Sequence, residues 1–131
     1  MSDEAVREAT AVWCAYAADD LRGAEDLLAM PDPRLGLVCY HCQQAAEKYL
    51  KSYLTSRQTP FRPVHQMEYL VQRCMASDLT FAEVLDAAVS LQPYASDVRY
   101  PFGPFEPPSL TDADAAIACA RQIRDFVLSR L

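Results

Sequence analysis

The sequence lacks a long hydrophobic run and lacks a basic N-terminal segment. No apolar stretch approaches the roughly 18 residues that a membrane span requires. The first charged residues, Asp3 and Glu4, are acidic, whereas a signal peptide begins with positive charge. The chain has 131 residues, of which 51% are apolar and 23% charged, a composition typical of soluble globular proteins. We therefore expect a single domain over residues 1–131, located in the cytoplasm.

Positive charge is also scarce. Twelve Lys and Arg residues stand against 18 Asp and Glu, so the formal net charge is −6. Affinity for a nucleic-acid backbone comes mainly from Lys and Arg that neutralise phosphates, so the composition argues against a general nucleic-acid-binding protein. The region of Lys48, Lys51, Arg57 and Arg62 is locally basic and could still line a small cleft for an anion. Binding of RNA therefore stays open.

The cysteines are odd in number, and each occupies an apolar position of a predicted helix. We interpret all five as reduced core residues: Cys14, Cys39, Cys42, Cys74 and Cys119. Cys39 and Cys42 form a CxxC pair around His41, a spacing that also occurs in metal and redox sites. However, His41 lies roughly 160° to 200° around the helix from Cys39, so the three side chains cannot converge on one ion. We therefore expect no metal and no other cofactor.

The chain contains no convincing period-two segment, whereas apolar residues recur at helical spacing. Proline-rich connectors divide this pattern into five helices, expected at about residues 2–30, 32–56, 65–75, 80–98 and 111–131. Thr80 with Glu83, and Thr111 with Asp114, are expected to form capping boxes, and Pro93 to kink or restart the fourth helix. Short connections imply antiparallel neighbours. The predicted fold is an all-α, up-and-down bundle of four long helices and one short helix.

Two groups of polar residues are not needed by such a bundle. His41, Gln44 and Lys48 follow one another at steps of three and four along one flank of the second helix, where they could bind an anion or a nucleotide. Arg99 and Tyr100 follow the fourth helix and add a planar guanidinium, a hydroxyl and a stacking face. These five residues are the candidate ligand-binding residues. The alternative is that the row on the second helix is only a solvated face.

Four pieces of the sequence resemble the HEPN domain family. In order they are Ala17–Leu21 with Ala24, Tyr40–Lys51 (YHCQQAAEKYLK), Val64–Met67 (VHQM) and Val98–Pro101 (VRYP). The string in the second helix is the most specific of them. The resemblance implies a helical bundle, commonly a homodimer, that is often encoded beside a minimal nucleotidyltransferase. In such toxin–antitoxin-like pairs the HEPN protein is the substrate-binding or toxin partner.

Many HEPN proteins are metal-independent ribonucleases, and the resemblance implies where their motif would lie. That motif is an Arg followed about four to six residues later by a His, with two such pairs facing each other across a dimer. After Arg99 the corresponding positions hold Gly103, Pro104 and Phe105, and no histidine follows His65. The catalytic imidazole of the motif is absent, so we expect no nuclease activity by that mechanism. His65 itself is expected to close a turn through a side-chain hydrogen bond.

Three functions remain to be compared. The first is a non-enzymatic partner of a nucleotidyltransferase that binds a nucleotide or another phosphate-bearing ligand. The second is a metal-independent ribonuclease in which His41 replaces the missing imidazole and Asp20 orients Arg99, although Asp20 and Arg99 could equally form a structural ion pair. The third is a structural protein–protein interaction module, in which Phe102 and Phe105 cover a partner or a second copy of the chain. The alternative for these two residues is that they close the end of the core, the usual place of Phe.

Overall fold

The computed structural model describes residues 1–95 and 106–131. The helices are α1 (Asp3–Leu28), α2 (Leu35–Ser56), α3 (Met67–Met75), the 3-10 helix η1 (Leu79–Val84), α4 (Leu85–Leu91), the 3-10 helix η2 (Gln92–Tyr94) and α5 (Leu110–Leu128). Neither described range contains a β-strand. None of the described helices is long and apolar enough to cross a membrane. The predicted all-α bundle is confirmed.

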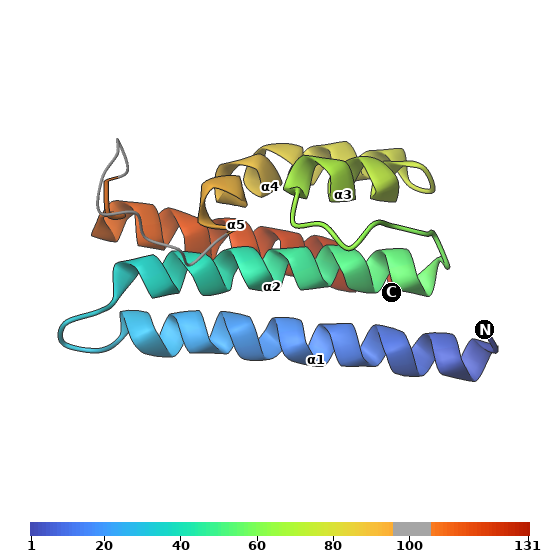
Figure 1. Cartoon of the computed structure of the whole chain (residues 1–131), viewed down its shortest axis with the longest axis horizontal. Coiled ribbons are helices and arrows are strands. Elements are labelled where there is room, and N and C mark those ends of the chain that lie inside the picture. Colours follow the sequence, from blue (N-terminus) through green and yellow to red (C-terminus); the bar gives the residue numbers. More distant parts are fainter. Residues whose placement is uncertain (96–105) are drawn as a thin grey trace.

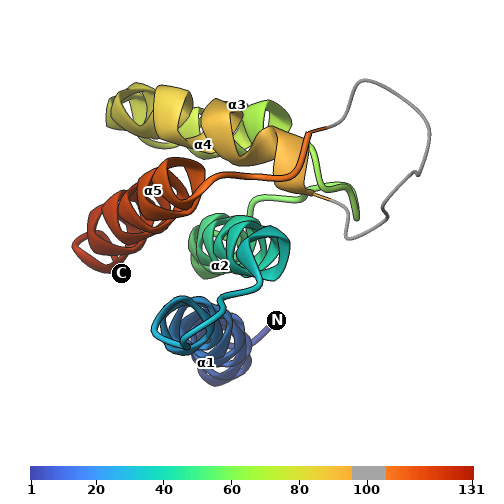
Figure 2. The ribbon, with the colours of Figure 1, turned by 90° about the vertical axis from the view of Figure 1, so that its left-hand side faces the viewer.

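Helix α2 is the centre of the bundle. It packs against α1, α3, α4 and α5. Figure 1 shows α1 and α2 side by side as an antiparallel hairpin, with α3 and α4 forming a separate layer over α2 and α5. The view along the helices in Figure 2 shows α1 at the edge of the molecule, next to α2. Because four helices surround α2, a polar side chain on it reaches solvent only where two neighbours leave a gap.

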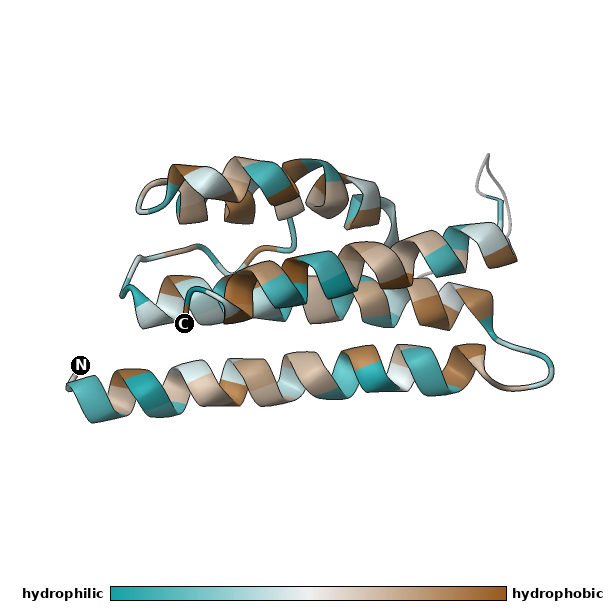
Figure 3. Ribbon diagram, turned by 180° about the vertical axis from the view of Figure 1, so that it is seen from behind, coloured by the Kyte–Doolittle hydropathy of each residue, from teal (hydrophilic) through white to brown (hydrophobic). Residues whose placement is uncertain are grey.

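That gap is narrow. Between Cys39 and Leu54 every α2 residue is buried except four, Tyr40, His41, Gln44 and Lys48. We call these four residues the α2 slot. Hydrophobic and hydrophilic residues alternate along each helix in Figure 3, as expected for amphipathic helices, but α2 is buried far beyond its apolar face. Its buried residues include the polar Gln43, Glu47, Lys51 and Ser52.

The predicted fourth long helix is a composite of three parts. The 3-10 helix η1 leads into α4, which has only seven residues, and η2 follows directly. Pro93 lies in η2, because a proline is tolerated in a new first turn but breaks an α-helical interior. The predicted capping box of Thr80 and Glu83 is wrong. Asp78 caps η1 instead, and its carboxylate accepts the backbone N–H of Thr80 at 2.9 Å.

The capping box predicted at Thr111 and Asp114 is also wrong, because α5 begins earlier. The hydroxyl of Ser109 accepts the N–H of Asp112 at 3.0 Å, and the Asp112 carboxylate accepts the N–H of Ser109 at 2.9 Å. Ser caps a helix as well as Thr does, so two overlapping capping patterns compete in this sequence. The upstream pattern is the one that forms.

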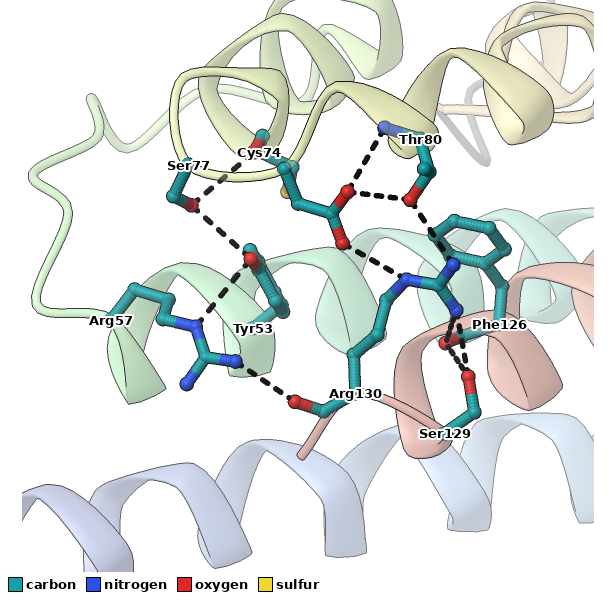
Figure 4. Close-up of polar contacts among 9 residues, drawn as sticks. Tyr53, Arg57, Cys74, Ser77, Thr80, Phe126, Ser129 and Arg130 are labelled. Carbon is teal, nitrogen blue, oxygen red and sulfur yellow. Dashed lines mark hydrogen bonds and ion pairs between the residues drawn. The ribbon is translucent and has the colours of Figure 1, made fainter.

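A cluster of arginine contacts joins the ends of α2 and α5 to the start of η1 (Figure 4). The Arg130 guanidinium donates to Asp78 Oδ2 at 3.0 Å and to Thr80 Oγ1 at 3.1 Å. Arg57 donates to the carbonyl oxygen of Arg130 at 3.1 Å and to the Tyr53 hydroxyl at 3.4 Å. We call these residues the arginine clamp: Tyr53, Arg57, Asp78, Thr80 and Arg130. It fixes the end of the bundle opposite the α1–α2 connection.

Candidate functional site

The α2 slot brings together the three residues that the sequence analysis placed in one row. His41, Gln44 and Lys48 are all partly exposed, although their immediate neighbours along α2 are buried apart from Tyr40. Tyr40 lies beside them, and its ring contacts the His41 ring edge to face, with centroids 5.4 Å apart. The row is therefore an opening in an otherwise buried helix rather than a broad solvated face.

Asp20 of α1 holds two of these residues. Its Oδ1 lies 3.0 Å from His41 Nδ1, and its Oδ2 accepts a hydrogen bond from Lys48 Nζ. The side chains are 15% exposed for Asp20, 32% for His41 and 25% for Lys48, so water reaches the cluster without surrounding it. We call these three residues the Asp20 cluster.

The carboxylate of Asp20 also determines which ring nitrogen of His41 carries a proton. An ionised carboxylate can only accept hydrogen bonds, so His41 Nδ1 must carry a proton. His41 Nε2 is then left without a hydrogen-bond partner among the described residues. An imidazole fixed in this way presents Nε2 to a ligand, as an acceptor when neutral and as a donor when protonated.

The charges of the Asp20 cluster nearly cancel. Asp20 contributes one negative charge and Lys48 one positive charge, so the cluster is neutral when His41 is neutral and carries +1 when His41 is protonated. The Lys48 ammonium has three N–H donors, of which the contact with Asp20 needs one. The cluster therefore has donors to offer to an anion without a large standing positive charge.

A second polar cluster lies on the adjacent flank of α2 and was not predicted from the sequence. Glu47 is 3% exposed; its Oε2 accepts from Lys51 Nζ at 3.0 Å, and its Oε1 lies 2.8 Å from His65 Nδ1. Gln43 Nε2 donates to the same Oε1 at 3.1 Å. We call these four residues the Glu47 cluster. The only sequence signal was the polar i, i+4 spacing of Gln43, Glu47 and Lys51.

Aromatic rings enclose the cation of the Glu47 cluster. The Lys51 ammonium lies 5.6 Å from the centroid of the Trp13 ring and 6.0 Å from that of Phe61. The two rings contact each other with centroids 6.5 Å apart. Cation–π attraction and the Glu47 carboxylate together compensate for the loss of water around this buried ammonium.

One hydrogen bond connects the α2 slot with the Glu47 cluster. Gln44 Nε2 donates to Gln43 Oε1 at 2.7 Å. The polar side chains of α2 therefore form a continuous path from Gln44 through Gln43 and Glu47 to His65. His65 was expected to close a turn, but its side chain instead bonds to the buried Glu47 of α2.

The CxxC pair belongs to the core. Cys39 and Cys42 are fully buried, and burial raises the pKa of the Cys42 thiol to about 12. None of the five cysteines forms a disulfide. Within residues 1–95 and 106–131 no three His, Cys, Asp or Glu side chains are grouped so that they could hold a metal ion.

Two candidate ligand-binding residues, Arg99 and Tyr100, lie outside the described residues, as do Phe102 and Phe105. The predicted contact between Asp20 and Arg99 therefore also lies outside them. What the described residues show is that both carboxylate oxygens of Asp20 already have partners on α2.

The chain matches the family model of the HEPN domain over residues 10–131. It is similar to the crystal structure of TT1696 from Thermus thermophilus, with a TM-score of 0.80 and 26% identity over 93% of this chain and 98% of that one. It is also similar to ST0689, an archaeal HEPN homologue, with a TM-score of 0.73 and 26% identity over 92% of this chain and 96% of that one. No curated protein matches this chain.

Proposed function

This chain belongs to the HEPN domain family, and we propose that it binds a nucleotide or another phosphate-bearing ligand at the α2 slot. The observation that carries the proposal is the Asp20 cluster, in which one carboxylate holds an imidazole and an ammonium at an opening of a buried helix. The imidazole and the ammonium are thereby held in place before a ligand arrives. Preorganised donors of this kind bind anions with less loss of side-chain entropy than free lysines do.

Phosphate oxygens are suitable acceptors for the donors that the cluster leaves open. Lys48 keeps N–H groups that Asp20 does not use, and a protonated His41 adds Nε2–H. Hydrogen bonds between charged groups are shorter and stronger than neutral ones, and partial burial protects them from salt screening. In this proposal Arg99 and Tyr100 supply further phosphate and stacking contacts.

We further propose that the protein acts as a homodimer and as the partner of a nucleotidyltransferase in a toxin–antitoxin-like pair. Membership of the HEPN family supports this role, because such domains are often associated with nucleotidyltransferases. A cytoplasmic location is part of the proposal, since cysteines that form no disulfide suit a reducing compartment. Light scattering over a range of concentrations tests the dimer, and a monomer at the highest concentration would contradict it.

Thermal unfolding with and without ligand tests the binding proposal. ATP, GTP and AMP at millimolar concentration are each expected to raise the Tm of the wild-type chain, because a ligand that binds only the folded state stabilises it. His41→Ala and Lys48→Gln are expected to reduce or abolish that increase. Arg22→Gln is the matched control for charge, because Arg22 is exposed and forms, among the described residues, an ion pair with Asp26 alone, at 3.9 Å. No increase with any of the three nucleotides would contradict the proposal.

A second candidate function, metal-independent ribonuclease activity through Arg99 and His41, is favoured by one observation. Asp20 fixes the His41 ring through Nδ1 and leaves Nε2 open, an arrangement that suits a general acid or base. RNA cleavage in the presence of EDTA should then be lost in both Arg99→Ala and His41→Ala. Asp20→Asn should retain part of the activity, since the amide oxygen can still accept from Nδ1. Cleavage that survives both Arg99→Ala and His41→Ala would exclude this mechanism.

A further inference from the structure

The side-chain amide of Gln43 has a fixed orientation. Gln43 is fully buried, and its Nε2 lies 3.1 Å from Glu47 Oε1 and 3.4 Å from Met67 Sδ. A carboxylate paired with Lys51 and a thioether sulfur both act as acceptors, so the Gln43 nitrogen must face them. Its oxygen is then confined to the opposite side of the amide. The assignment of nitrogen and oxygen thus follows from two independent partners.

The orientation of Gln43 determines that of Gln44. Gln44 Nε2 donates to Gln43 Oε1 at 2.7 Å. A reversed Gln44 amide would place two carbonyl oxygens against each other and leave the buried oxygen of Gln43 without a donor. The nitrogen of Gln44 is therefore anchored toward the interior. Its carbonyl oxygen has no hydrogen-bond partner among the described residues and is available in the α2 slot.

We propose that Gln44 determines ligand specificity, by presenting a fixed hydrogen-bond acceptor beside the phosphate-binding donors of His41 and Lys48. This inference rests on the proposed binding of a phosphate-bearing ligand at the α2 slot. A ligand that fits both features carries a phosphate and, close to it, a hydroxyl or amino group that donates to Gln44 Oε1. In a nucleotide this donor is a ribose hydroxyl or an exocyclic amino group of the base.

The buried Glu47 is the origin of this specificity, although it does not touch the ligand. A free glutamine can turn its amide and match either a donor or an acceptor. Gln44 loses that freedom because its partner Gln43 is held by Glu47, which is only 3% exposed. A ligand with an acceptor at this position would meet the Gln44 oxygen and lose a hydrogen bond without gaining another.

Titration calorimetry with AMP and two analogues tests the inference. 2′,3′-Dideoxy-AMP lacks the ribose hydroxyls, and purine riboside monophosphate lacks the exocyclic amino group. We expect one of the analogues to bind about three- to tenfold more weakly than AMP, the effect of one lost hydrogen bond, and this analogue identifies the donor. Gln44→Met keeps the length of the side chain but has no amide, so it should bind AMP and that analogue equally.

Two further variants complete the experiment. Gln72→Met makes the same change at an exposed glutamine of α3 and should keep the preference of the wild type. In Glu47→Gln the side chain at position 47 can also donate a hydrogen bond, so the amides of Gln43 and Gln44 can turn. This variant should show a weaker preference for AMP over the analogue. Its affinity for inorganic phosphate should stay within about twofold of the wild type. Circular dichroism establishes that each variant is folded. If Glu47→Gln does not fold, Gln44→Met alone suffices for the test.

The outcomes separate the two proposals. If AMP and both analogues bind equally to the wild type, or if the preference persists in Gln44→Met, the role of Gln44 is overturned and nucleotide binding stands. If neither AMP nor inorganic phosphate binds to the wild type, the proposed function fails and this inference fails with it.

Discussion

Asp20 and Glu47 make the same kinds of contact, but they differ in how far they are buried. Each carboxylate binds the Nδ1 of a histidine and the ammonium of a lysine of α2. The ion pair of Glu47 with Lys51 is closed to water, with side chains 3% and 8% exposed. The side chain of Asp20 is 15% exposed and its lysine 25%. The comparison indicates that burial, rather than the kinds of residue, separates a fixed scaffold from an adaptable site.

The physical reason is that breaking an ion pair costs more free energy in a buried site than in a partly exposed one. A buried charge that loses its counter-ion has no water to replace it, so the pair of Glu47 and Lys51 holds one arrangement, although His65 is 63% exposed. In the Asp20 cluster, water or a ligand can take over a hydrogen bond when a side chain moves. Ligand binding is therefore expected at the Asp20 cluster, and the Glu47 cluster is expected to orient the residues around it.

Removing the buried carboxylate should have the largest effect. Glu47→Ala leaves the Lys51 ammonium unpaired and takes an acceptor from Gln43 and His65, so we expect a loss of about 3–5 kcal/mol in the free energy of unfolding. Urea denaturation measures it, and the exposed Glu83→Ala, expected to change stability by less than about 0.5 kcal/mol, is the control. A loss below about 1 kcal/mol would contradict the expected cost of leaving Lys51 unpaired in a buried site.

Thiol labelling should show whether α2 is open only at the slot. Burial raises the pKa of Cys42 and of Cys74 to about 12, so only about one such thiol in ten thousand is ionised at pH 8. Iodoacetamide should therefore label the partly exposed Cys14 and Cys119 first, and all five cysteines in denaturant. Mass spectrometry of peptides identifies the sites. Rapid labelling of Cys42 in the native protein would mean that the helix opens on its core side.

Removing the partly exposed carboxylate of Asp20 should have a smaller effect on stability. Asp20→Ala is expected to lower the free energy of unfolding by about 1–2 kcal/mol, because water can still solvate His41 and Lys48. The same variant should lose most of its response to nucleotides, because the two side chains are no longer aimed. If Asp20→Ala is as destabilising as Glu47→Ala, burial does not distinguish the clusters.

Asp78, in the arginine clamp, should give the smallest effect. Hydrogen bonds from Thr80, and then the contact with Arg130, lower the pKa of Asp78 below its usual value of 3.8. A carboxyl whose pKa is lower in the folded than in the unfolded chain stabilises the fold above the unfolded value, and this contribution is lost as the pH falls through the folded value. An NMR titration should place its midpoint below 3.8, and nearer to 3.8 in Thr80→Ala than in Thr80→Ser. An Asp78 midpoint at 3.8 in the wild type would contradict this assignment.

Much of the fold could be predicted from local patterns. Apolar residues at helical spacing predicted the helices, and the prolines around residues 31–33 and 60–63 marked the connections correctly. The exact helix starts could not be predicted at Thr80 and Thr111, because Asp78 and Ser109 are equally good caps a few residues upstream. Two competing caps stabilise a helix by similar free energies, and the tertiary contacts contribute more than the difference between them. The tertiary contacts therefore decide which cap forms.

The candidate site could be predicted only in part. The row of His41, Gln44 and Lys48 follows from the helical repeat, because residues three and four apart share a face. The partner of that row, Asp20, was expected to meet Arg99, since no local pattern shows which α2 residues face α1. The Glu47 cluster was missed because its histidine and its aromatic rings come from separate parts of the chain.

By itself, the sequence determined the helical class, the core face of α2 and the HEPN resemblance, because these depend on residues close together in the chain. Only the tertiary structure decided how far each polar residue is buried. Gln43, Glu47 and Lys51 occupy a flank of α2 that an isolated helix would expose, and α1, α3 and their connections cover it. Solvent access depends on the neighbouring helices and connections. It is the one difference that separates the α2 slot from the Glu47 cluster.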